Sequence, residues 1–124
     1  MQYSLARTEQ GQTLGITAKM ANRHGLIAGA TGTGKTVTLR KMAEAFSDDG
    51  VPVFLVDVKG DLSGLVKAGT FSGKVAERIE QFDLGGESYL NGYPVSFWDV
   101  FGETGIPLRT CLLYTSPSPR DLST

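Results

Sequence analysis

The feature that most constrains the fold is a glycine-rich stretch between a short apolar run and an amphipathic segment. Residues 29–36 read Gly-Ala-Thr-Gly-Thr-Gly-Lys-Thr and satisfy the pattern G-x-x-x-x-G-K-[ST] at every defined position. Residues 25–28, just before it, are mostly apolar. The apolar residues after it recur at the spacing of one helix face: Leu39, Met42, Ala43 and Phe46. This order predicts a buried strand, a phosphate-binding turn and a helix.

A second strand is expected after this helix. Asp48-Asp49-Gly50 stops the helical pattern, since glycine is the usual residue just past a helix end. Residues 51–56 are then apolar on both faces, which is typical of strands buried in a parallel sheet with helices on each side. The sequence therefore predicts a βαβ unit and an α/β fold built on a parallel sheet.

The other segments give shorter predictions. Alternating apolar residues within residues 1–24 suggest one or two short strands, a hairpin being one arrangement: Tyr3, Leu5, Leu14 and Ile16. Residues 61–67 could form a short helix, and the spacing of Val75, Ile79 and Phe82 predicts a helix over 73–82. Residues 93–100 alternate as a third strand would, with Phe97 and Trp98 expected in the core rather than as a base-stacking platform.

The residue types of the loop suit phosphate binding. Glycines allow backbone dihedral angles that let successive amides turn towards a phosphate, and a helix start offers unpaired amides and a positive dipole end. Lys35 would reach the β- and γ-phosphate oxygens, and the Thr36 hydroxyl would coordinate Mg²⁺. The residues expected to contact the nucleotide, ATP above all, are Ala30, Thr31, Gly32, Thr33, Gly34, Lys35, Thr36 and Val37.

Two alternatives compete with a triphosphate loop. One is a Gly/Thr turn between strand and helix that binds nothing. The other is a dinucleotide-binding loop, because Gly32-Thr33-Gly34 begins as G-x-G; however, Val37 stands where the third glycine should be. The Lys35-Thr36 pair also favours a triphosphate with its metal.

Two acidic residues follow the second predicted strand. Ligands of doubly wound sheets bind beyond the carboxyl ends of the strands, so Asp57 or Asp61 could face the Mg²⁺, its waters or the attacking water. Asp61 could equally cap the short helix that follows it. Asp57 is therefore a candidate catalytic and metal-binding residue, and both readings stay open for Asp61.

Length, charge and composition limit the classes of protein to which the chain can belong. The 124 residues suit one small domain, and a formal net charge of −1 gives no bulk basic field for nucleic acid or an anionic membrane. No apolar run approaches the roughly 20 residues of a membrane helix, and the first residues lack the apolar block of a secretory signal. The single cysteine excludes an internal disulfide. A cytoplasmic protein without a membrane segment is expected.

Residues 111–124 form a separate segment. The run from Cys111 to Asp121 reads like the translation of a transposase-end sequencing adapter, while the alternative is a natural Ser/Pro-rich tail. We expect a non-native segment and a gene that continues past Thr110.

The chain resembles the HerA-like helicases of the HerA–FtsK group of DNA motors. The resemblance rests on Asn22–Thr36, on Pro52–Gly64, where the second predicted strand ends in Asp57 and Gly60-Asp61, and on the Tyr-Pro-Val-Ser-Phe-Trp-Asp segment at Tyr93–Asp99. It implies a RecA-like P-loop fold, Mg-ATP hydrolysis, homo-hexamers and a DNA substrate. In this interpretation residues 1–24 are a lead-in and 25–110 the first part of the ATPase domain.

The resemblance also implies that the chain is the ATP-binding, amino-terminal part of a helicase or translocase. The later Walker B Asp-Glu, sensor residues and arginine finger of the family have no counterpart within residues 1–110, so the fragment alone is expected to be inactive. Two alternatives remain open: a nucleotide-dependent regulatory module, and a conjugation- or secretion-type ATPase.

Overall fold

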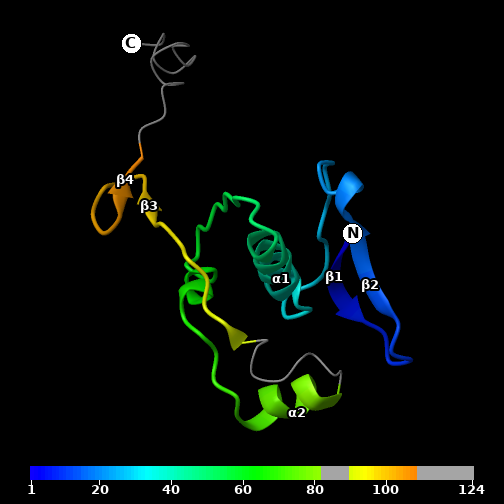
Figure 1. Cartoon of the computed structure of the whole chain (residues 1–124). Helices are drawn as coiled ribbons and strands as arrows, with labels where there is room; N and C mark the ends of the chain where they lie inside the picture. The colour runs from blue at the N-terminus through cyan, green and yellow to red at the C-terminus, as the bar shows by residue number, and fades with distance from the viewer. Residues whose placement is uncertain (82–89, 109–124) are drawn as a thin grey trace. The chain divides into compact units, whose positions relative to one another are not determined.

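The computed structural model describes residues 1–81 and 90–108, which form two compact units that divide between Pro94 and Val95 (Figure 1). Among the described residues, the first unit contains a hairpin, two α-helices and the short 3₁₀ turns η1 and η2. The second holds a pair of two-residue strands. The predicted α/β class therefore holds, whereas Phe82 and residues 111–124 lie outside the described residues.

The amino-terminal hairpin confirms the strands predicted within residues 1–24. Strand β1 (Gln2–Arg7) pairs antiparallel with β2 (Thr13–Thr17). Tyr3 lies opposite Ile16, and an irregularity in the register falls between Ser4 and Ala6. A single 3₁₀ turn, η1 (Ala18–Met20), follows the hairpin.

Helix α1 (Lys35–Asp48) occupies the segment predicted to be helical, and the predicted glycine, Gly50, lies just past its end. Gly50 has φ 74°, the left-handed conformation in which glycine is favoured. Its amide donates to the Ser47 carbonyl at 3.0 Å, and the Val51 amide donates to the Phe46 carbonyl at 2.9 Å. These two hydrogen bonds form a Schellman motif, which satisfies carbonyls at the helix end.

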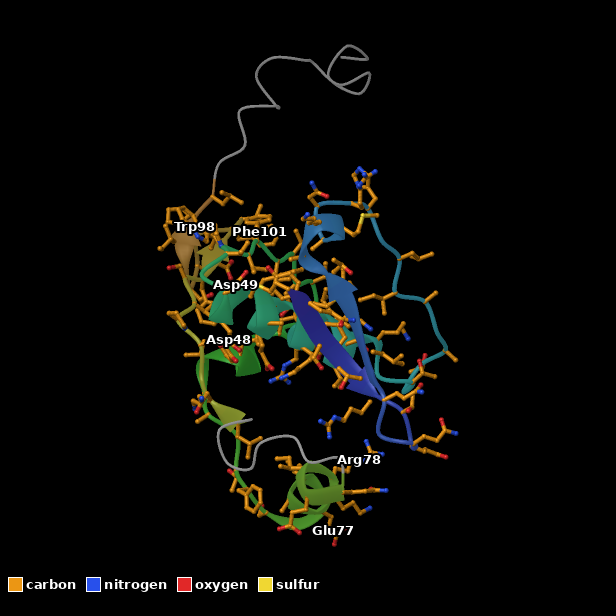
Figure 2. All side chains as sticks on the ribbon, turned by 45° about the vertical axis from the view of Figure 1, so that its right-hand side comes forward. Asp48, Asp49, Glu77, Arg78, Trp98 and Phe101 are labelled. Carbon is orange, nitrogen blue, oxygen red and sulfur yellow. The ribbon has the colours of Figure 1, made fainter. Side chains whose placement is uncertain are left out.

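Strand β1 of the hairpin lies beside α1 (Figure 1), and Tyr3 makes the contact between them. The Tyr3 ring meets the Phe46 ring edge-on, with centroids 4.8 Å apart, and its hydroxyl donates to Asp49 Oδ2 at 2.6 Å. That hydrogen bond, then burial and the Asp49 charge, raise the pKa of the Tyr3 hydroxyl. Figure 2 shows Asp48 and Asp49 together at the carboxyl end of α1. The described core is small: Tyr3, Ala43, Leu62, Leu65 and Ile79.

The strands predicted at residues 25–28 and 51–56 are wrong for the described structure. Both segments are free of helix and strand. Leu26 is 88% exposed and Phe54 is 73% exposed, so neither segment is buried between helices. A strand exists only through hydrogen bonds to a neighbouring strand, and among residues 1–81 and 90–108 these segments have no strand partner. The βαβ unit and the helix-flanked parallel sheet are therefore not formed.

Two short elements continue the first unit. The helix expected within 61–67 is a 3₁₀ turn, η2 (Ser63–Val66), and the helix expected over 73–82 is α2 (Gly73–Gln81), with Ile79 only 2% exposed. The chain returns beside η2, where the Gly69 amide donates to the Leu90 carbonyl at 2.7 Å. The Tyr93 amide likewise donates to the Leu65 carbonyl at 2.8 Å. These bonds fix residues 90–93 against 65–69.

The second unit contains β3 (Trp98–Asp99) and β4 (Ile106–Pro107), which pair in parallel. The strand predicted over 93–100 is thus reduced to two residues. Phe97 and Trp98, expected in the core, are 50% and 54% exposed. The burial prediction fails because two two-residue strands offer no second layer to cover these rings.

Candidate phosphate-binding site

The loop before α1 adopts a backbone that requires two of its glycines. Gly32 has φ 79° and Gly34 has φ 93°, both in the left-handed region that other L-residues rarely adopt. Gly29 is needed for a different reason, because a Cβ there would lie only 2.5 Å from Thr33 Oγ1. All three glycines of the motif therefore have a steric or conformational role.

The Ala30 carbonyl accepts several hydrogen bonds from other residues of the loop. It accepts hydrogen bonds from the Thr33 hydroxyl at 2.7 Å and from the Thr33 amide at 3.4 Å. Lys35 Nζ also donates to it, at 2.7 Å. The lysine side chain thus folds back across the loop, and its contact with a phosphate stays a prediction.

The start of α1 presents amides without a side-chain cap. Gly34 is the N-cap residue and its carbonyl accepts from the Thr38 amide and hydroxyl, at 3.0 and 3.2 Å. The first amides of any α-helix lack intrahelical acceptors, and here they belong to residues 34–37. The first turn contains no acidic residue, so no carboxylate offsets the positive end of the helix dipole. These properties are those of an anion-binding site.

The Asp57 carboxylate accepts hydrogen bonds from the backbone amides of the turn that follows it. Its Oδ1 accepts from the amides of Lys59 at 3.2 Å and Gly60 at 2.9 Å, and its Oδ2 accepts from the Leu62 amide at 3.0 Å. The Leu62 hydrogen bond leads the causes that lower the pKa of the Asp57 carboxyl, ahead of the opposing burial and the other amides. A carboxylate that accepts several amides is stabilised in its charged form.

Of the two roles left open for Asp61, the helix cap is not formed, because the N-cap residue of η2 is Leu62 and no side chain caps it. The hydrogen bonds described for Asp57 all lie within residues 57–62, and none joins it to the loop. The structure therefore brings Lys35, Thr33 and Ala30 together and leaves Asp57 in a turn of its own.

Sequence reasoning missed a second acidic turn, centred on Asp99. Its carboxylate accepts from the Phe101, Glu103 and Thr104 amides at 2.8–3.0 Å. The Thr104 and Phe101 hydrogen bonds lead the causes that lower the pKa of Asp99 to about 2. A sequence signal was present, since Asp at the start of a turn with a glycine inside it is typical of such side-chain-capped turns.

It also missed a groove of about 480 Å³ that runs along α1. Four groove residues fall at the i, i+3, i+4, i+7 spacing of one helix face: Val37, Arg40, Lys41 and Glu44. The opposite wall comes from residues 64–70 and 90–91, with Val75 of α2. Only the apolar face of α1 was considered from the sequence, so this polar face was overlooked.

Comparison with known protein families identifies the chain. Its residues 2–117 match the family model described as "Helicase HerA-like C-terminal". The chain belongs to the HerA-like helicase family. The match covers the hairpin, the loop, both α-helices and the second unit, and it extends into residues 111–117. Because this model represents a C-terminal domain, it does not support the predicted amino-terminal position in the parent helicase.

Comparison with curated proteins and with solved structures gave no match. Within residues 1–81 and 90–108, no helix is long and apolar enough to cross a membrane. The same residues contain no cluster of three or more His, Cys, Asp or Glu side chains arranged to hold a metal ion.

Proposed function

We propose that residues 29–37 bind the phosphates of ATP, with Mg²⁺ at Thr36, and that this HerA-like chain serves an ATP-driven DNA helicase or translocase. The observation that carries the proposal is the shape of the loop. Two left-handed glycines, Gly32 and Gly34, lead directly into an uncapped helix start. This combination of left-handed glycines and unpaired helix amides is the backbone arrangement with which phosphate-binding loops hold anions.

Lys35 would change partners when ATP binds. Its ammonium group donates to the Ala30 carbonyl at 2.7 Å. A β- or γ-phosphate oxygen carries a formal negative charge and the carbonyl oxygen only a partial one, so the ammonium group is attracted more strongly to the phosphate. The lysine would therefore leave the carbonyl for the phosphate, while the Thr36 hydroxyl joins the coordination shell of Mg²⁺.

The finer parts of the proposal concern the complete protein. The exposed apolar segments at 25–28 and 51–56 support a RecA-like sheet in the complete protein, in which further strands would pair with them and helices would cover both faces. Asp57 keeps lone pairs that could meet Mg²⁺ or its waters, although three amides already hold the carboxylate. Hexamers, a DNA substrate and a cytoplasmic location complete the proposal and follow from the family.

Titration calorimetry of the 124-residue chain with Mg-ATP tests the site. Lys35→Ala should weaken binding at least about tenfold, because it removes a charge-assisted hydrogen bond worth roughly 1.5–3 kcal/mol. Lys19→Ala is the matched control, since Lys19 is exposed on η1, and it should leave the affinity unchanged. Equal affinities for the wild type and Lys35→Ala would refute the phosphate-loop assignment.

Thr36→Ala separates the metal from the phosphates. The variant should lose the gain in ATP affinity that Mg²⁺ gives, while its affinity for ATP in the presence of EDTA stays that of the wild type.

The motor proposal is tested by measuring ATP turnover of the complete parent protein with and without duplex DNA. Turnover that no DNA accelerates would favour a regulatory module instead.

A further inference from the structure

The groove along α1 begins where the phosphate loop ends. Val37 is both the last residue assigned to the loop and the first groove residue on α1. It directly follows Thr36, and its side chain is 65% exposed. With a helical rise of about 1.5 Å per residue, Arg40 lies about 4.5 Å further along the axis. A ligand whose anionic end occupies the loop would therefore reach the groove with its other end.

The lining of the groove combines apolar surface with charged side chains, among them Arg40, Lys41, Glu44 and Lys67. Leu65, Val75 and Leu90 supply apolar surface, and Leu65 is only 7% exposed. The Arg40 guanidinium lies over Gly64, where an added Cβ would be 3.4 Å from an Arg40 terminal nitrogen. Glycine at position 64 thus leaves the space in which the planar cation rests.

We propose that this groove holds the nucleoside of the nucleotide bound by the loop, with Arg40 against the face of the base. The inference rests on the proposed function, because it needs the phosphates to bind at residues 29–37. A purine base offers a π-face that stacks on guanidinium groups and on apolar side chains. A volume of about 480 Å³ also falls in the range of sites that bind small organic ligands.

A ligand that consists of phosphates alone would make no contact with the apolar part of the groove. Inorganic triphosphate ends at the loop and has no apolar surface to place against Leu65 or Leu90. The nucleoside has that surface, and its burial would add affinity in proportion to the apolar area removed from water. Arg40 therefore makes the site prefer a nucleotide over its phosphate chain alone.

The test compares Mg-ATP with Mg-tripolyphosphate by calorimetry on the 124-residue chain. Arg40→Ala should raise the Kd for Mg-ATP about tenfold, since base stacking contributes roughly 1–3 kcal/mol, and leave the Kd for tripolyphosphate unchanged. Arg40→Lys keeps the charge but loses the planar group, so it should show most of the same selective loss. Lys19→Ala again serves as the control, and circular dichroism checks that α1 is intact.

Each result has one meaning. Equal losses for both ligands in Arg40→Ala would mean a general electrostatic effect, and no loss for either would mean that the base lies elsewhere; both overturn the inference. A wild type that binds neither ligand would refute the phosphate loop itself. Photolabelling with 8-azido-ATP gives a measurement without substitution: label on the peptides containing Leu65 or Leu90 supports the groove, and label only elsewhere contradicts it.

Discussion

Residues 35–48 and residues 51–56 lie next to one another in the chain, and both are rich in apolar side chains, yet only the first forms a regular element. Helix α1 has defined ends, from Gly34 to the Schellman motif at Gly50. Residues 51–56 contain neither helix nor strand, and Val56 is 77% exposed. The same contrast separates α1 from residues 25–28 on its other side.

The contrast shows what each kind of element needs from the rest of the molecule. An α-helix closes its backbone hydrogen bonds within its own segment, so α1 needs only a packing partner, which Tyr3 of the hairpin provides. A strand closes them only on a neighbour. Among the described residues, no strand lies beside 25–28 or 51–56.

Amide hydrogen exchange gives the largest expected effect. Amides in the middle of α1 should exchange at least about 100-fold more slowly than those of residues 25–28 and 52–56, because the helical amides are hydrogen-bonded along α1, whereas these two segments belong to no strand ladder among the described residues. Mass spectrometry of peptic fragments measures both regions in one sample. Equal protection of the three segments would break the comparison.

Among the substitutions proposed here, Tyr3→Ala should lower the free energy of unfolding most, because Tyr3 joins the hairpin to α1. It removes the ring from Phe46 and the hydroxyl from Asp49, and truncating a buried aromatic side chain costs about 3 kcal/mol of unfolding free energy. Urea unfolding followed at 222 nm measures the loss. Tyr3→Phe removes only the hydroxyl and should cost about 1 kcal/mol. If Tyr3→Ala unfolds at the wild-type urea concentration, the hairpin does not hold α1.

Gly50→Ala tests the end of α1, and Gly25→Ala, in the segment before the loop, is its matched control. Gly50 has φ 74°, and an L-residue in that conformation costs about 1 kcal/mol. Gly25→Ala adds the same methyl group at a position where no atom lies within 4 Å, and its effect should be near zero. Equal effects of the two substitutions would mean that α1 does not depend on its glycine stop.

Alkaline pH should have the smallest of these effects on stability, through the contact of Tyr93 with Asp48 at the carboxyl end of α1. Burial, followed by the hydrogen bond to Asp48 at 3.1 Å and the charges of Asp48 and Glu44, raises the pKa of Tyr93 to about 12. Because the folded-state pKa lies above the ordinary value of 10, this contribution is complete below pH 10 and is lost as the pH rises through 12.

Tyrosinate absorbance at 295 nm follows this titration. Subtracting the curve of Tyr93→Phe from that of the wild type isolates the one hydroxyl, and unfolding midpoints at pH 9 and pH 11 give the stability change. A difference curve with a midpoint at pH 10 would show that the contact with Asp48 does not persist in solution.

The backbone of the loop and the helix start could be predicted because they depend on local residues, whereas nucleotide binding by the loop stays a prediction. The loop pattern placed Lys35 and Thr36 at the first turn of α1, and three glycines have the backbone or steric roles that such a loop needs. Asp57 was predicted as an acid near the metal, and whether it reaches Mg²⁺ stays a prediction. The Arg40 groove could not be predicted from the sequence, because more than half of its lining comes from residues 64–70 and 90–91.

By itself, the sequence determined the elements whose hydrogen bonds close over short distances along the chain: the hairpin, the loop, α1 with its glycine stop, and α2. Only the tertiary structure decided which apolar residues are covered. It buried Tyr3 against Phe46 and left Leu26, Phe54 and Trp98 exposed, although all read as core side chains. The reason is physical, since periodicity marks a face that can be buried, whereas burial itself requires a second surface to meet it.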